Sequence, residues 1–180
     1  MNILLLLLCM SSTSLSSEVS TIGREIESSI QVHNALNRTE KKTRKSSFRV
    51  ITNTSVGSGT SFELCDKTLI FTAQHVVEGS TNTYISKGLE IIEVKQVYKD
   101  EKNDFAILRV PDDANIDGFK LNILKKFGDD IVGEKVHYSG FPNGHDKLTI
   151  HGVIVGHERN HILVQAFGWF GASGSGLFDS

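Results

Sequence analysis

The feature that most constrains the fold is a regular series of short β-rich runs, separated by turn residues, from Phe48 onward. Short strands at even spacing are typical of a β-sandwich or a β-barrel. Composition agrees, because Val and Ile together number 30 against 6 Ala, and β-branched side chains suit a pleated surface. We therefore expect an all-β domain with strands at 48–53, 58–65, 68–73, 82–86, 89–98, 104–110, 134–140, 147–156 and 161–167.

Length and charge narrow the class of protein further. The chain has 180 residues, which is enough for one domain and an N-terminal segment. Its formal charge of −2 at pH 7 provides no broad positive field that could hold a phosphate backbone. We therefore expect no nucleic acid partner.

The first 17 residues predict a secretory signal peptide. Residues 3–10 form an apolar run, and small Ser and Thr side chains follow it. A membrane anchor would need about 20 apolar residues, so we expect no stable membrane span and a secreted or periplasmic protein. Cleavage would remove Cys9 and leave Cys65 alone, so the mature domain would have no internal disulfide.

Residues 18–47 differ from the rest of the chain. Ile22, Ile26 and Ile30 recur at helical spacing, and Lys41, Lys42, Arg44 and Lys45 form a basic run. This pattern predicts an amphipathic helix followed by a solvated basic linker, and it leaves open whether the segment is a propeptide. A single domain would then occupy 48–180, with halves at about 48–112 and about 130–180.

Three residue types that together support nucleophilic catalysis occur in the β-rich region. Ser173 lies in the segment Gly171-Ala172-Ser173-Gly174-Ser175-Gly176, whose glycines let main-chain N–H groups converge on an anion. His75 follows an apolar strand, and Asp104 opens a strand apolar enough to be buried. A serine needs a base to take its proton, and the base needs an acceptor that fixes its tautomer. A carboxylate beside a buried strand needs a partner, and an imidazole N–H is a suitable one.

Four motifs follow one another along the chain: Gly57-Ser58-Gly59-Thr60, Thr72-Ala73-Gln74-His75-Val76-Val77, Asn103-Asp104-Phe105-Ala106-Ile107-Leu108 and Gly171-Ala172-Ser173-Gly174-Ser175. In order and separation they resemble the successive signatures of chymotrypsin-like serine proteases, in particular the bacterial HtrA/DegP-type branch. The resemblance spans residues 57–177. It implies an all-β fold of two six-stranded Greek-key β-barrels.

The resemblance also implies roles for individual residues. Ser173 would attack the peptide carbonyl, His75 would act as base and then acid, and Asp104 would orient the imidazole. The N–H groups of Gly171 and Ser173 would form the oxyanion hole. Phe167 resembles the base of the substrate pocket, and its apolar side chain argues against a preference for Lys or Arg. The implied enzyme is a serine endopeptidase that acts on protein or peptide substrates without a cofactor, and its oligomeric state is left open.

Chain order excludes two other serine arrangements. An α/β-hydrolase elbow reads G-x-S-x-G and places its acid and histidine after the serine, whereas only seven residues follow Ser173. A subtilisin order would use Asp66, but Cys65-Asp66-Lys67 between two strands predicts a hairpin turn. Ser175 is the competing nucleophile, and the position directly before the first inner glycine favours Ser173.

The remaining histidines do not predict a metal site. His157 and His161 are four residues apart, and this spacing gives a shared face only on a helix. Residues 147–167 alternate like strands. We therefore expect no metal.

The sequence departs from the family pattern at its end. Chymotrypsin-like proteases complete the second barrel, and one wall of the substrate pocket, with a strand pair after the nucleophile. The end of this chain near Ser173 makes the second barrel incomplete, unless the natural product continues or a partner supplies the strands. A catalytically inactive binding or scaffold protein of the same fold is therefore the alternative function.

Overall fold

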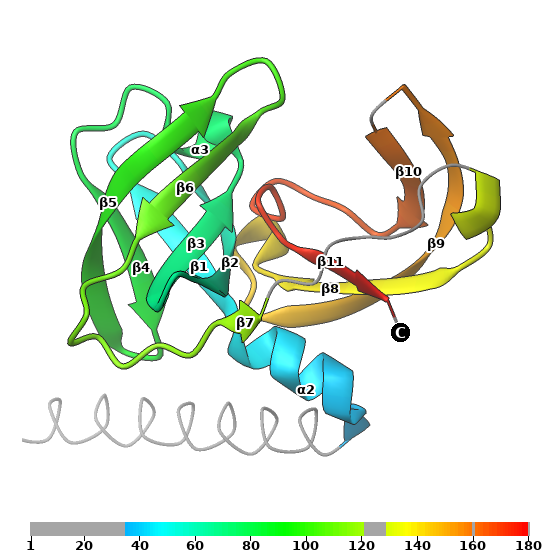
Figure 1. Cartoon of the computed structure of the whole chain (residues 1–180), viewed down its shortest axis with the longest axis horizontal. Coiled ribbons are helices and arrows are strands. Elements are labelled where there is room, and N and C mark those ends of the chain that lie inside the picture. Colours follow the sequence, from blue (N-terminus) through cyan, green and yellow to red (C-terminus); the bar gives the residue numbers. More distant parts are fainter. Residues whose placement is uncertain (1–34, 121–128, 160, 180) are drawn as a thin grey trace, which may run out of the picture. The chain divides into compact units, whose positions relative to one another are not determined.

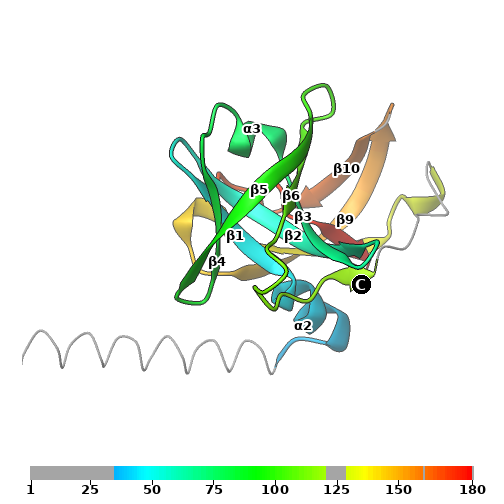
Figure 2. The same ribbon diagram turned by 60° about the vertical axis from the view of Figure 1, so that its left-hand side comes forward.

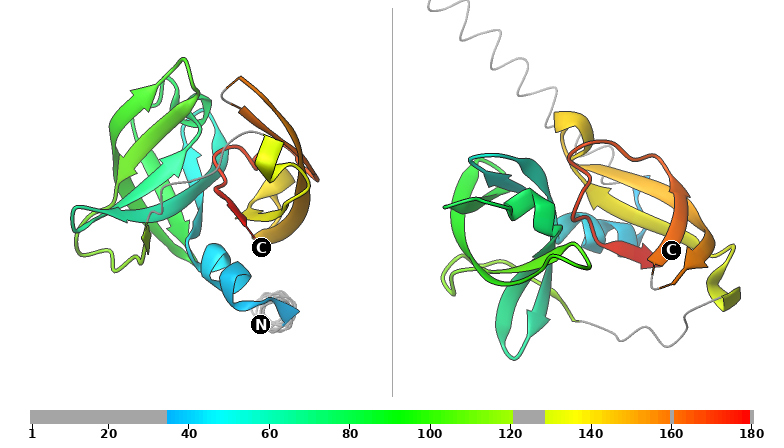
Figure 3. Two further views of the ribbon diagram at one scale, coloured as in Figure 1. Left: turned by 45° about the vertical axis from the view of Figure 1, so that its right-hand side comes forward. Right: turned by 90° about the horizontal axis from the view of Figure 1, so that it is seen from above.

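Six antiparallel strands close into a β-barrel in the first half of the chain. The computed structural model describes residues 35–120, 129–159 and 161–179. The strand order is β1-β4-β5-β6-β3-β2, and β1 pairs again with β2, so the sheet closes on itself. The right-hand view of Figure 3 shows this barrel end-on as a ring. Its strands are β1 (Ser47–Thr52), β2 (Val56–Leu64), β3 (Lys67–Thr72), β4 (Thr83–Lys87), β5 (Glu90–Asp100) and β6 (Phe105–Arg109).

Alternate residues of these strands fill the barrel interior. In β6, for example, Ala106 and Leu108 are fully buried while Arg109 is exposed, as the two-residue period of a strand requires. A continuous core of this kind stabilises the barrel without a disulfide. The buried core consists of Phe48, Val50, Ile70, Ala73, Val76, Val77, Ile85, Ile92, Val94, Ala106, Leu108 and Val110.

The second half forms a four-stranded antiparallel sheet among the described residues. Its strands are β8 (Lys135–Gly140), β9 (Leu148–Glu158), β10 (His161–Ala166) and β11 (Leu177–Asp179), in the order β10-β9-β8-β11. β10 and β11 are therefore edges of an open sheet within that part of the chain (Figure 1). Two short 3-10 turns, η1 (Asp129–Ile131) and η2 (Pro142–Gly144), flank β8.

All nine strand predictions are confirmed to within a few residues, and the all-β class with them. Two short strands were not predicted: β11, and β7 (Phe119–Lys120), which pairs parallel to β2. His157 lies on β9 and His161 on β10, so their spacing is that of a hairpin and not of a helix.

The basic run is part of a helix, so the prediction of a solvated linker is wrong there. Helix α2 (Arg38–Lys45) carries Glu40 in its first turn and Lys42, Arg44 and Lys45 in its last, which suits the helix dipole. Thr43 is fully buried, and its hydroxyl contacts Nε2 of His137 in β8 at 2.9 Å. Glu40 Oε1 contacts Nε2 of His151 in β9 at 2.5 Å.

Helix α2 therefore packs on the second sheet. It lies at the opposite end of the first barrel from the one-turn helix α3 (Gln74–Val77), as Figures 1 and 2 show. The predicted signal peptide and the helix with Ile22, Ile26 and Ile30 lie outside the described residues. None of the helices in the described part of the chain is long and apolar enough to cross a bilayer.

Candidate active site

His75 is held at one end of the first barrel by its neighbours in helix α3. The helix follows strand β3 directly, and Val76 and Val77 are buried in the barrel core. The His75 side chain faces solvent, with 51% of its surface accessible. The apolar residues around it fix the main chain, so the imidazole is presented at a defined place.

Asp104 binds both the main chain and the ring of His75. Its Oδ1 accepts the His75 N–H at 3.0 Å, and its Oδ2 lies 2.7 Å from Nδ1. Burial raises the pKa of Asp104. The hydrogen bonds from the main chain and the ring of His75 lower that pKa, and together they outweigh burial, so the pKa lies below its ordinary value. An ionised carboxylate only accepts hydrogen bonds, so Nδ1 carries the proton and Nε2 is left as the basic nitrogen.

The surroundings of Asp104 are more open than the sequence predicts. Asp104 lies in the turn before β6 with a φ of 53°, and 51% of its side chain is accessible. Strand β6 is buried only at alternate positions, so it does not enclose the carboxylate. The partner of Asp104 is the predicted one, although its environment is not the buried one expected.

The motif at residues 57–60 in β2 joins the two halves of the molecule. Gly57 and Gly59 leave room for core side chains, because an added Cβ would lie 2.6 Å from Val76 Cγ2 or from Ile70 Cγ2. Ser58 and Thr60, on the alternate positions, direct their hydroxyls to residues 171–176, here called the serine loop. Thr60 Oγ1 accepts the N–H of Gly176 at 2.8 Å.

Two further hydrogen bonds fix the serine loop to Ser58. The Ser58 N–H donates to the carbonyl of Ser173 at 2.8 Å, and the Ser58 hydroxyl donates to the carbonyl of Gly171 at 2.6 Å. Gly174 adopts a φ of +87°, and an added Cβ there would lie 2.8 Å from the Ala73 nitrogen. The serine loop thus lies directly against the end of β3, two residues before His75 (Figures 1 and 3).

Ser173 and His75 are brought into one region but are not hydrogen-bonded to each other. Within the described residues, the Ser173 side chain and Nε2 of His75 have no hydrogen-bond partner. Within the same residues, the N–H groups of Gly171 and Ser173 donate no hydrogen bond. The loop therefore presents a free hydroxyl together with the free N–H groups of Gly171 and Ser173.

Two other predicted residues occupy distinct places. The Ser175 hydroxyl is buried and has no hydrogen-bond partner in the described structure, and an added Cβ at Gly140 would clash with it. The Ser175 hydroxyl is therefore not accessible to a substrate, as a nucleophile has to be. Phe167 is 56% exposed, and its carbonyl accepts the Tyr138 hydroxyl at 2.6 Å.

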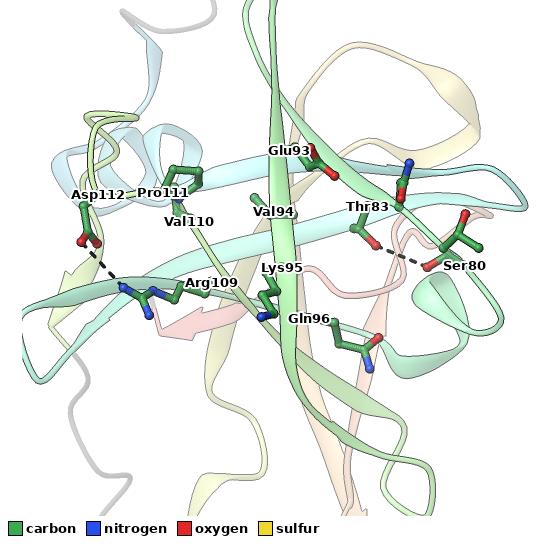
Figure 4. Close-up of a pocket in the computed structure, with 12 residues that line it drawn as sticks. Ser80, Thr83, Glu93, Val94, Lys95, Gln96, Arg109, Val110, Pro111 and Asp112 are labelled. Atoms are coloured by element: carbon green, nitrogen blue, oxygen red, sulfur yellow. Dashed lines mark hydrogen bonds and ion pairs between the residues drawn. The ribbon is translucent and has the colours of Figure 1, made fainter.

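A pocket of about 740 Å³ lies elsewhere on the first barrel and contains none of the predicted site residues. It runs along β5 and the end of β6 (Figure 4). Glu93 and Lys95 of β5 both line it, and Arg109 is paired with Asp112 at 3.7 Å. Charges of both signs share this lining, so it shows no preference for an anion or a cation.

Sequence reasoning missed the residues that hold the serine loop. The sequence predicts no role for Ser58, nor for Phe141, whose N–H donates to the Ser58 hydroxyl at 3.0 Å, nor for Asn143, whose N–H donates to the Phe170 carbonyl at 2.6 Å. A signal was present, since small hydroxyl residues alternate with glycines in β2, and this is unusual for a strand facing a core.

Comparisons with known proteins agree with this fold. The active form of the Rv3671c protease from M. tuberculosis is 23% identical over 79% of this chain and 69% of that chain, with a TM-score of 0.64. The serine endoprotease of Yersinia pestis gives 22% identity, coverage of 80% and 54%, and a TM-score of 0.69. Deg5 gives 22% identity, coverage of 81% and 82%, and a TM-score of 0.63.

These structural likenesses show that the chain has the chymotrypsin-like fold. No curated protein matches the chain in sequence. The trypsin-like peptidase domain matches residues 56–180, which include His75, Asp104 and Ser173. The chain therefore belongs to the trypsin-like peptidase domain family.

Proposed function

We propose that the chain is a serine endopeptidase in which Ser173 is the nucleophile, His75 the general base and acid, and Asp104 the residue that orients the base. The proposal is carried by the 2.7 Å contact between His75 Nδ1 and Asp104 Oδ2. That contact leaves Nε2 free to take a proton. The neighbouring strand β2 binds the serine loop through Ser58.

The reaction would proceed through an acyl-enzyme. The Ser173 Oγ forms a bond to the peptide carbonyl carbon while its proton passes to His75 Nε2. The C–N bond then breaks, and the same proton passes to the leaving amine. A water molecule repeats the sequence and releases the acid. Asp104, whose pKa is lowered, stays negative at neutral pH and stabilises the imidazolium.

The developing oxyanion would be bound by the N–H groups of Gly171 and Ser173. Both lack an acceptor within the described residues, so no hydrogen bond has to break before they bind. Gly171 has a φ of +92°, which residues with a Cβ rarely adopt. Donors of this kind lower the barrier by about 3 to 4 kcal/mol each when they are preorganised.

Substrate and location are further parts of the proposal. The substrates would be proteins or peptides, and the exposed apolar side chain of Phe167 favours an uncharged side chain in the primary pocket. The apolar N-terminal run followed by small residues would direct export. N-terminal sequencing of secreted protein tests this, and a mature N-terminus at Met1 would contradict it.

A fluorophosphonate probe tests the enzyme. Ser173 Oγ forms a bond to phosphorus, fluoride leaves, and His75 takes the proton. We expect covalent labelling of the wild type, and a loss of more than about a thousand-fold in Ser173→Ala and His75→Ala. The matched control is Ser175→Ala, which removes a neighbouring buried hydroxyl. It should label like the wild type and be as stable or up to about 1 kcal/mol more stable.

A non-catalytic binding or scaffold protein is the second candidate. It is favoured by the missing hydrogen bond between His75 and Ser173 in the described structure, and by the half-exposed His75 and Asp104 side chains. Wild-type protein that unfolds cooperatively but takes no label would support the scaffold. Labelling that persists in Ser173→Ala would overturn the assignment of the nucleophile.

A further inference from the structure

We propose that the Ser58 hydroxyl is a positioning residue that sets the direction of the two main-chain N–H groups in the serine loop. This inference rests on the proposed function, since it concerns how the oxyanion hole of that enzyme is held. Ser58 itself would touch neither substrate nor the reacting atoms. It would act through the peptide unit between Gly171 and Ala172.

Each carbonyl around Ser173 already has a donor. The carbonyl of Phe170 accepts the Asn143 N–H at 2.6 Å, and that of Ala172 accepts the Ser175 N–H at 3.0 Å. The other two carbonyls, those of Gly171 and Ser173, both bind Ser58. In a trans peptide the C=O and the following N–H point in opposite directions. Fixing the carbonyls of Phe170 and Ala172 therefore directs the N–H groups of Gly171 and Ser173, which lie on the opposite sides of the same peptide units.

The peptide unit between Gly171 and Ala172 lies between the N–H groups of Gly171 and Ser173. Its carbonyl is held by the Ser58 hydroxyl at 2.6 Å, and its N–H donates to the Trp169 carbonyl at 3.0 Å. Rotation of this unit would change the angle between the two free donors. Gly171 gives little resistance to such a rotation, because glycine tolerates a wide range of φ and ψ.

The Ser58 hydroxyl is well placed to resist that rotation. Ser58 is fully buried, and its Oγ accepts the Phe141 N–H at 3.0 Å, so its proton is directed at Gly171. It is the only side-chain donor among the four groups that bind the carbonyls of residues 170–173 in the described structure. A single substitution can therefore remove it without changing the main-chain bonds.

Strand β2 also supplies a matched control, Ser61. Ser61 is fully buried like Ser58, and its hydroxyl donates to a distant carbonyl, that of Asp117, at 2.7 Å. Asp117 has no contact with the serine loop in the hydrogen bonds of the described residues. Ser61→Ala therefore reproduces the loss of a buried hydrogen bond in the same strand without touching the oxyanion hole.

The test compares the kinetics of fluorophosphonate labelling in full-length wild type, Ser58→Ala and Ser61→Ala. We expect the maximal labelling rate of Ser58→Ala to fall by about ten- to a hundred-fold, less than for the removal of a direct oxyanion donor. The probe concentration at half-maximal rate should stay the same. Ser61→Ala should label at the wild-type rate, while urea unfolding should show a loss of stability in both variants.

The outcomes separate the two proposals. Unlabelled wild type contradicts the proposed function itself. Labelled wild type with equal rates in Ser58→Ala and Ser61→Ala overturns only the role of Ser58. If Ser58→Ala does not fold, the same comparison is made with Ser58→Cys and Ser61→Cys, because a thiol is a weaker donor than a hydroxyl. A slower rate in Ser58→Cys alone supports the role, and equal rates overturn it.

Discussion

The two halves of the molecule differ in whether their sheet closes into a barrel. The first is a closed barrel with twelve residues in its buried core. The second, in the described residues, is an open sheet whose core cluster has three buried residues, Ile131, Val136 and Ile154. A closed sheet has no free edge and surrounds its core on all sides, whereas an open one leaves part of its apolar face to solvent.

This difference explains how the candidate site is held. His75 and Asp104 both come from the closed barrel and bind each other there. Ser173 comes from the chain between β10 and β11 of the open sheet, and its loop is fixed by Ser58 and Thr60 of the barrel. The barrel thus supplies the proposed base and most of the hydrogen bonds that hold the serine loop, whereas the second half supplies the chain that carries Ser173 and the N–H of Asn143, which binds the Phe170 carbonyl.

The largest expected effect compares equivalent substitutions in the two cores. Ile85 in the barrel is 0% exposed and Ile154 in the sheet is 5% exposed. We expect Ile85→Ala to lower the free energy of unfolding by about 4 kcal/mol and Ile154→Ala by about 2, because a partly open site relaxes around the cavity. Urea unfolding measures both values. Equal losses would show that the second sheet is packed as tightly as the barrel.

The strands could be predicted from the sequence because their signals are local. Hydrophobic alternation and turn residues identify each long strand. β7 and β11 have only two and three residues, and they exist through pairing with β2 and β8, which no local pattern shows. Helix α2 was missed because its buried residues, Glu40 and Thr43, are polar and so are invisible to a search for apolar periodicity.

The candidate site was only partly predictable. His75, Asp104 and Ser173 were identified through a family resemblance, and the contact between the first two agrees with it. The role proposed for Ser58 depends on a hydrogen bond between residues 113 positions apart, and nothing in its neighbouring sequence indicates that partner. Long-range contacts of polar groups are therefore the part of this site that only the structure provides.

We expect a smaller effect on stability from the contact between helix α2 and the second sheet. The Thr43 hydroxyl donates to the Thr39 carbonyl at 3.0 Å and so accepts from Nε2 of His137. Thr43→Val keeps the shape but removes this acceptor from a buried imidazole, so we expect a loss of about 1 to 2 kcal/mol in the free energy of unfolding. Thr81→Val, at an exposed position, is the control and should change it by less than about 0.5 kcal/mol. Similar effects of the two variants would show that α2 contributes little to the second sheet.

The smallest effect concerns the acid sensitivity of the two halves. Burial lowers the pKa of His137, and this outweighs the opposing influence of Glu40, while His151 lowers the pKa further and Asp179 raises it. An unfolded histidine, with a pKa of about 6.5, then binds a proton more readily than folded His137. The free energy of unfolding should therefore fall as the pH drops below about 6.5, until the lower folded pKa is passed.

In the first barrel, Asp104 should respond at a lower pH. The lowered pKa of Asp104 means that its contribution is complete above about pH 4, the unfolded value, and is lost as the pH falls through the folded pKa. Urea unfolding between pH 7 and pH 5 should thus show a slope of at most about 1.4 kcal/mol per pH unit from His137. His137→Gln should reduce that slope, whereas His161→Gln, on exposed β10, should keep it. An unchanged slope in His137→Gln would assign the acid sensitivity to another group and remove this distinction between the halves.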